Sequence, residues 1–220
     1  MKILLVGASS DISKSLQNNF SSNYEFISLS SNSDFSSIDN FNILDPATYL
    51  EIDSIDGIVY FPGSINLKPF KRLSMDEFKK DYDINVLGVL NILKFYQSKL
   101  TIGASVVFIS SVAASVGMPF HSSISMCKSS LEALARSLAA EWAPKVRVNC
   151  VAPSLVNTKL SERFFRNEKQ QEQMNSRHPL NKTGSPEDIS NAIEFLLSKK
   201  SSWVTGQILN IDGGISSLKI

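Results

Sequence analysis

The chain has 220 residues, of which 43% are hydrophobic and 20% charged, and its 22 basic residues nearly balance its 21 acidic ones. This composition predicts a soluble globular protein with one domain over residues 1–220, and it argues against a disordered chain. A net charge of +1 gives no electrostatic reason to expect nucleic acid or an anionic membrane as a partner.

Further absences in the sequence narrow the class of protein. No stretch approaches the ~20 apolar residues that a membrane-spanning helix needs, and the apolar run at residues 3–6 is too short for a signal peptide. Two cysteines make no disulfide framework, and with two histidines they form no metal-spaced cluster. We therefore expect a cytoplasmic protein that has no metal site and acts on a small molecule.

Six short apolar runs alternate with longer helical patterns along the chain. The runs cover residues 3–6, 26–29, 58–61, 106–109, 146–151 and 208–211, and near-continuous apolar strands suit a sheet that is buried on both faces. The helical patterns cover residues 12–20, 75–99, 123–141 and 186–198. This alternation predicts an α/β fold of the Rossmann type, a doubly wound parallel sheet with helices on both faces.

Two segments interrupt this regular pattern. Residues 30–40 are rich in serine and asparagine and are predicted to form a surface loop. Residues 159–182 show little regularity and are predicted to form a mobile lid or substrate loop. His178 lies near the end of this lid and is interpreted as a solvated loop residue.

The turn after the first strand is a candidate phosphate-binding site. In such sheets ligands bind beyond the carboxyl ends of the strands, and the first turn holds phosphate on the N–H groups of the following helix. The residues at this turn are Gly7, Ser9, Ser10, Asp11 and Ile12. A carboxylate beside a pyrophosphate costs up to ~4 kcal/mol at an effective dielectric near 20, unless Asp11 turns away and caps the helix. Taken alone, a plain tight turn explains this segment equally well.

Ser111 and Lys128 are separated by seventeen positions, with Ile124 four positions before the lysine. This segment resembles the active site of the short-chain dehydrogenase/reductase family, in which a serine is followed by Tyr-x-x-x-Lys. The resemblance covers most of the chain, including the segments at residues 83–88, 147–158, 184–188 and 203–214. It departs from the family's pattern at Ile124, which occupies the position of the tyrosine.

The resemblance implies a reaction in which a hydride passes between a nicotinamide and a carbonyl or alcohol carbon. Ser111 would hydrogen-bond the substrate oxygen, Lys128 would hold the nicotinamide ribose, and Asn85 would order a water in the proton relay. Ile124 cannot deliver a proton. His121, three residues earlier, is our candidate for the substitute acid; the alternative is that it only starts the helix.

The resemblance also implies contacts with the two ends of the cofactor. Ser30 ends the second strand where an acid would bind the ribose hydroxyls of NAD, so NADP is weakly favoured and NAD stays open. Asn42 matches the adenine-contacting position, and Gly63 would let the backbone approach the cofactor. The nicotinamide carboxamide would be held by a third set of residues, Pro153, Val156 and Thr158.

These residues favour an NAD(P)-dependent oxidoreductase acting on a small hydroxyl or carbonyl compound. The alternative is a catalytically silent relative that binds nucleotide or serves as a scaffold or regulator, and non-redox chemistry such as elimination or epimerisation is a weaker third interpretation. The resemblance further implies a homodimer or homotetramer assembled through the helical segments at residues 75–99 and 123–141.

Overall fold

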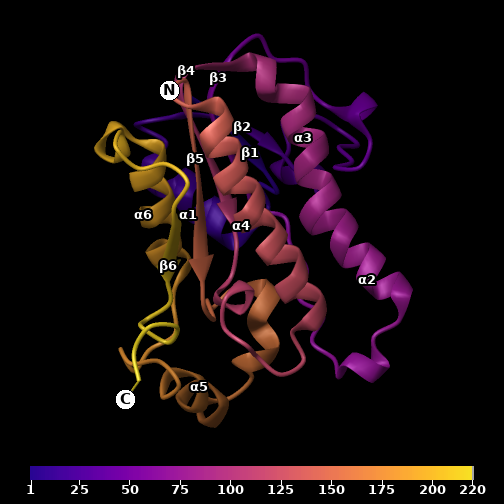
Figure 1. Ribbon diagram of the computed structural model, residues 1–220, viewed down its shortest axis with the longest axis vertical. Coiled ribbons are helices and arrows are strands. Elements are labelled where there is room, and N and C mark those ends of the chain that lie inside the picture. Colours follow the sequence, from indigo (N-terminus) through magenta and orange to yellow (C-terminus); the bar gives the residue numbers. More distant parts are fainter. Residues whose placement is uncertain (220) are drawn as a thin grey trace.

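A six-stranded parallel sheet forms the centre of the computed structural model, which describes residues 1–219 (Figure 1). The strand order is β2-β1-β3-β4-β5-β6. The strands are β1 (Lys2–Val6), β2 (Glu25–Leu29), β3 (Ile55–Tyr60), β4 (Leu100–Ile109), β5 (Val146–Pro153) and β6 (Ile208–Ile211). All six predicted strands are present and the predicted fold class is confirmed.

Alternation along the strands builds a core on each face of the sheet. In β1, Leu4 and Val6 belong to one hydrophobic cluster, whereas Ile3 and Leu5 belong to the other, as the two-residue period of a strand requires. All four side chains are fully buried. The chain leaves β1 toward β2 on one side and returns to β3 on the other, which makes β1 the switch point where such sheets bind ligands.

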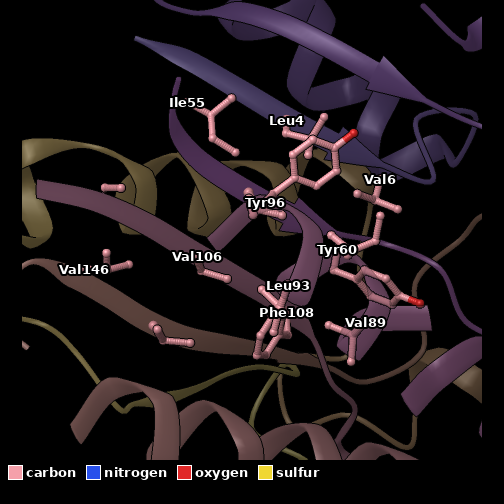
Figure 2. Packing of buried hydrophobic residues seen from close by; sticks show 14 of the residues in the cluster. Leu4, Val6, Ile55, Tyr60, Val89, Leu93, Tyr96, Val106, Phe108 and Val146 are labelled. Carbon is pink, nitrogen blue, oxygen red and sulfur yellow. The ribbon is translucent and has the colours of Figure 1, made fainter. Parts of the chain in front are cut away.

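Helices cover both faces. Those of ten residues or fewer are α1 (Asp11–Phe20), α2 (Met75–Tyr82), α3 (Gly88–Tyr96) and α5 (Glu168–Asn175); α4 (Ser122–Trp142) and α6 (Pro186–Leu197) are longer. Buried residues of α3 and α4 pack on the face that includes Leu4, and those of α1 and α6 pack on the opposite face. Figure 2 shows the first cluster, in which Tyr60 and Phe108 from the sheet lie near Val89 and Leu93 of α3.

The helix predicted over residues 75–99 is a continuous run with a local irregularity. A π-helical turn, Asp83–Leu87 (η4), separates α2 from α3. Ser74 begins the run with a capping box, in which its side chain accepts from Glu77 N–H while the Glu77 side chain accepts from Ser74 N–H. Because π-turns insert an extra residue, η4 changes which side chains of this run face the sheet.

The structure confirms the prediction for one of the two irregular segments and corrects the other. Residues 30–40 contain only a short 3-10 turn, Ser33–Phe35 (η1), and are mostly exposed, as predicted. The expectation of low regularity over residues 159–182 was wrong, because the segment contains a 3-10 helix, Lys159–Phe164 (η7), and α5. Helix α5 is built from good helix formers but buries no residue, so it lacks the apolar period by which a helix is recognised. Within residues 1–219, no helix is both long and apolar enough to cross a membrane.

Candidate functional site

A cavity of about 850 Å³ opens at the carboxyl ends of β1, β3, β4 and β5. It collects residues that are far apart in the sequence, because the ends of parallel strands share one edge of the sheet. Every sequence-predicted site residue except Asn85 and His121 lines it: Gly7, Ser9, Ser10, Asp11, Ile12, Ser30, Asn42, Gly63, Ser111, Lys128, Pro153, Val156 and Thr158.

The turn between β1 and α1 has the features of a phosphate cradle. Gly7 has a φ of +79°, and a Cβ built on it would lie 3.0 Å from the Pro62 ring, so a side chain is excluded here. Ser10 caps α1, its Oγ accepting from Ser13 N–H at 3.2 Å. The start of a helix carries unpaired N–H groups and a partial positive charge, both of which favour a phosphate.

Asp11 does not cap α1, because Ser10 does. Instead, Asp11 Oδ2 accepts a hydrogen bond from the backbone N–H of Lys159 at 2.7 Å. This bond connects the turn between β1 and α1 directly to the first residue of η7. The Asp11 carboxylate, which the sequence analysis placed near the expected phosphates, therefore holds one end of the segment 159–182.

The far end of the cavity lies beside β2. Ser30 is 3% exposed; its Oγ donates to Ser9 Oγ at 3.0 Å and accepts from Asn32 N–H at 3.1 Å. Asn42 Oδ1 accepts from Leu44 N–H at 3.0 Å, which leaves Nδ2 as its donor toward a ligand. This end is lined by hydroxyl and amide groups, with no carboxylate among the residues that line it between Ser30 and Ile43.

Ser111 and Lys128 meet at the other end of the cavity. Ser111 Oγ accepts from Ala113 N–H at 3.2 Å, so its own O–H can be donated to a ligand. Lys128 Nζ donates to the Ile109 carbonyl at 2.8 Å. Burial disfavours the charged ammonium and lowers the pKa of Lys128 to about 8. Ile124, one helical turn before this lysine, also lines the cavity and carries only carbon atoms.

Asn85 lies just behind the cavity in η4 and is fully buried. Its Nδ2 donates to the Asp81 carbonyl at 2.8 Å and to Ser64 Oγ at 3.1 Å, while its Oδ1 has no hydrogen-bond partner among residues 1–219. A Cβ on Gly63 would lie 3.4 Å from that Oδ1 and 3.2 Å from Lys128 Nζ. The side chains of Asn85 and Lys128 thus converge on Gly63, where a ligand or its water can satisfy Oδ1.

The structure does not bring His121 together with Ser111 and Lys128. His121 is the residue before α4, its Nδ1 lies 2.7 Å from the Pro119 carbonyl, and it is not among the residues that line the cavity. This placement matches the alternative interpretation, in which His121 only starts the helix.

Sequence reasoning missed three polar pairs at or beside the cavity. Ser110 Oγ donates to Glu132 at 2.7 Å, and Ser64 Oγ donates to Asp81 at 2.5 Å. Ser154, which lines the cavity, lies 2.9 Å from His178. The residues of each pair are far apart in the sequence, so no local pattern marks them.

The interpretation of His178 is also corrected by the structure. This residue is 4% exposed, so its interpretation as a solvated loop residue was wrong. Its Nδ1 lies 2.8 Å from the Met174 carbonyl, which can only accept, so Nδ1 donates there, while Nε2 lies 2.9 Å from Ser154 Oγ. Burial of this ring is possible because both of its nitrogens have partners.

Comparisons with known proteins show which family and which solved structures this chain resembles. A family profile described as Enoyl-(Acyl carrier protein) reductase matches residues 34–216. A tropinone reductase homolog of Arabidopsis thaliana is 36% identical over 169 residues, which cover 71% of this chain. The ligand-free aldohexose dehydrogenase of Thermoplasma acidophilum superposes with a TM-score of 0.91 at 26% identity, covering 99% of this chain and 94% of that one. A 4-hydroxyisoleucine dehydrogenase complexed with NADH covers 100% of both chains, with a TM-score of 0.85 and 25% identity.

The matched part of the curated relatives is shorter than those proteins. The aligned segment covers 64% of the first Arabidopsis relative and 47% of a second tropinone reductase homolog from the same organism. The chain therefore spans about half to two thirds of these relatives, whereas it matches the solved dehydrogenases over nearly their full length.

Proposed function

Because this chain belongs to the short-chain dehydrogenase/reductase family, we propose that it transfers a hydride between a nicotinamide cofactor and a small hydroxyl or carbonyl compound. One observation carries the proposal: Ser111 and Lys128 line the same cavity as the phosphate cradle at Gly7. A dinucleotide that spans this cavity would place its nicotinamide beside the two polar side chains.

Different residues of the cavity would contact different parts of the cofactor. The turn from Gly7 to Ile12 would hold the pyrophosphate, Asn42 Nδ2 would donate to the adenine edge, and Lys128 would donate to the nicotinamide ribose. Pro153, Val156 and Thr158 would hold the carboxamide. When bound, the cofactor supplies or accepts the hydride. Ser111 O–H would donate to the substrate oxygen, where negative charge grows during reduction.

We propose NADP as the preferred cofactor. An acid beside the ribose hydroxyls would favour NAD and repel a 2′-phosphate. The corresponding positions here are Ser30 and Ser31, which line the cavity and offer hydroxyl and backbone groups instead. Since Ser30 Oγ already bonds Ser9 and Asn32, the hydroxyl and backbone N–H of Ser31 are the groups available to a phosphate.

A catalytically silent nucleotide-binding protein is the second candidate. It is favoured by Ile124, which lines the cavity at the position of the family's tyrosine and has no proton to give. General acid catalysis is typically worth about 10²–10⁴-fold, so an enzyme without any replacement would be slow but measurable.

We also propose a homodimer or homotetramer formed through the helical run from α2 to α3 and through α4. Leu87, the last residue of η4 in that run, and Met126, in α4, are 38% and 48% exposed. Sedimentation or light scattering of the purified chain tests this. A monomer that resists association at high concentration would contradict it.

The function is tested by binding and turnover together. Thermal unfolding with NADPH or NADH at ~100 times its dissociation constant should show stabilisation of ~2.7 kcal/mol for a binding cofactor. NADPH oxidation is then followed with diacetyl, cyclohexanone, tropinone and acetoacetyl-coenzyme A. Turnover that Ser111→Ala abolishes supports the oxidoreductase, binding without turnover supports the silent protein, and no stabilisation by either cofactor excludes both.

A further inference from the structure

A buried carboxylate lies behind the cavity, apart from the serine and lysine of the family's motif. Asp81, in α2, is 4% exposed. Its Oδ1 accepts from Ser64 Oγ at 2.5 Å, and its Oδ2 accepts from Ser123 Oγ at 2.6 Å. Ser123 directly precedes Ile124, so this carboxylate lies next to the place where the proton donor is missing.

Ser64 connects this carboxylate to the cavity. It follows Gly63 and lines the cavity together with Ser111, Ile124 and Lys128. Its hydroxyl hydrogen is donated to Asp81, and one lone pair accepts from Asn85 Nδ2 at 3.1 Å. A hydroxyl has two lone pairs, so the second can accept a proton from a ligand in the cavity.

We propose that Ser64 and Asp81 form the proton relay of this enzyme, with Ser64 as the catalytic hydroxyl and Asp81 as the buried acid and base behind it. The proposal rests on the function proposed above. Ser123 and Asn85 are positioning residues, because each bonds one member of the pair and holds it in place.

Atoms and charges balance in this relay for both alcohol oxidation and carbonyl reduction. In alcohol oxidation, the substrate C–H bond breaks and a hydride passes to NADP⁺. The alcohol proton moves to Ser64 Oγ while the Ser64 proton moves to Asp81 Oδ1, so the products are a carbonyl compound, NADPH and neutral Asp81. The Asp81 proton returns through Ser64 to the open cavity after the carbonyl compound leaves. Carbonyl reduction runs the same transfers in reverse, with neutral Asp81 as the proton source.

The proposed relay explains two features of Asp81 that a purely structural role would not require, namely its burial and its serine partners. A carboxylate is rarely this buried, and here both of its oxygens are held by serine hydroxyls rather than by a cation. Because Ser64 donates directly to Asp81 Oδ1, a proton can pass between the hydroxyl and the carboxylate along this hydrogen bond. Among residues 1–219, Asp81 takes part in no salt bridge.

The test compares the relay in three backgrounds. Ser64→Ala and Asp81→Asn are made in the natural chain, in Ile124→Tyr, which restores the family's hydroxyl, and in Ile124→Phe, which adds the ring without the hydroxyl. NADPH oxidation is followed with the same four carbonyl probes, and NADPH binding is measured separately. Glu194→Gln, which changes a buried carboxylate bonded to Tyr24 outside the cavity, is the matched control.

We expect Ser64→Ala and Asp81→Asn each to lower kcat about 10²-fold or more with little change in NADPH binding. In Ile124→Tyr most of that loss should disappear, while in Ile124→Phe it should persist; Glu194→Gln should keep its kcat. Equal losses in all backgrounds would show that Asp81 is only structural, and unchanged kcat in both relay variants would exclude the relay while leaving the oxidoreductase intact. A natural chain that binds NADPH yet reduces no probe would contradict the proposed function, and the relay with it.

Discussion

Ser154 Oγ lies 2.9 Å from Nε2 of His178, and this hydrogen bond joins the end of β5 to the end of the segment 159–182. At the other end of the segment, Lys159 N–H donates to Asp11 at 2.7 Å. Both anchors come from strand ends or turns that line the cavity. The segment 159–182, whose first residues line the cavity, is thus bonded near both ends to other residues of the cavity wall.

Removing the first anchor should loosen the segment. Ser154→Ala leaves the buried His178 ring without one partner, which costs about 1–3 kcal/mol of unfolding free energy. Amide hydrogen exchange should speed up over residues 174–182. The control Ser176→Ala changes an exposed hydroxyl in the same segment and should leave exchange unchanged. Unaltered protection in Ser154→Ala would show that packing alone holds this end.

The charge of Asp11 should weaken cofactor binding. Asp11→Asn keeps an acceptor for Lys159 N–H and removes a negative charge from the phosphate-binding turn, so NADPH should bind several-fold more tightly. Asp11→Ala removes the same charge but also the bond to Lys159, so it should gain less. The gain should shrink at high ionic strength, because salt screens exposed charges. Calorimetric titration at two salt concentrations measures it, and a gain that does not depend on salt would contradict the electrostatic cause.

Lys128 should make the folded state less stable at neutral pH than an apolar residue would. Its pKa is about 8 in the folded chain against a usual value of 10.5, because burial disfavours the charge. Between these two values the unfolded chain binds more protons, so this lysine's contribution to the free energy of unfolding rises with pH and then levels off.

We therefore expect Lys128→Met to be more stable than the natural chain at neutral pH by about 1–3 kcal/mol, an advantage that shrinks as the pH rises from about 8 toward 10.5. Thermal unfolding of both chains across this pH range measures it. An advantage that grows with pH would mean that the folded chain stabilises the ammonium. The same variant should lose turnover, because its side chain cannot donate to the ribose.

The bond between Ser110 and Glu132 should stabilise the contact of β4 with α4. Glu132 is 8% exposed and accepts from Ser110 Oγ at 2.7 Å. Ser110→Ala removes the donor from a buried carboxylate and should cost about 1–3 kcal/mol in denaturant unfolding. Ser130→Ala, which changes a hydroxyl bonded to Met126 on the exposed side of α4, should cost much less. Equal costs would mean that solvent replaces the lost bond.

Most of the fold and much of the cavity could be predicted before the structure. The strands at residues 3–6 and 208–211 are short apolar runs between turns, a pattern that favours strands of a parallel sheet, although only the first of the two is fully buried. Many residues of the cavity follow strands β1 to β5 in the sequence, and a parallel sheet places all such positions at one edge. Position along the chain therefore determined which residues line the site.

Other features depended on contacts between distant parts of the chain. Ser64 is 17 residues from Asp81, which is 42 residues from Ser123, and Ser154 is 24 residues from His178. No local pattern distinguishes Asp81 from the exposed acids around it, and α5 has no apolar face to mark it.

The sequence by itself determined the sheet, the helices that pack on it and the predicted residues that line the cavity, because hydrophobic periodicity and strand ends are local properties. Only the tertiary structure decided that His121 lies outside the cavity and that Asp11 bonds Lys159. It also decided that a buried carboxylate lies behind Ser64. The physical reason is that a hydrogen bond between two distant residues requires both to be placed within about 3 Å, and that placement is set by the packing of whole elements.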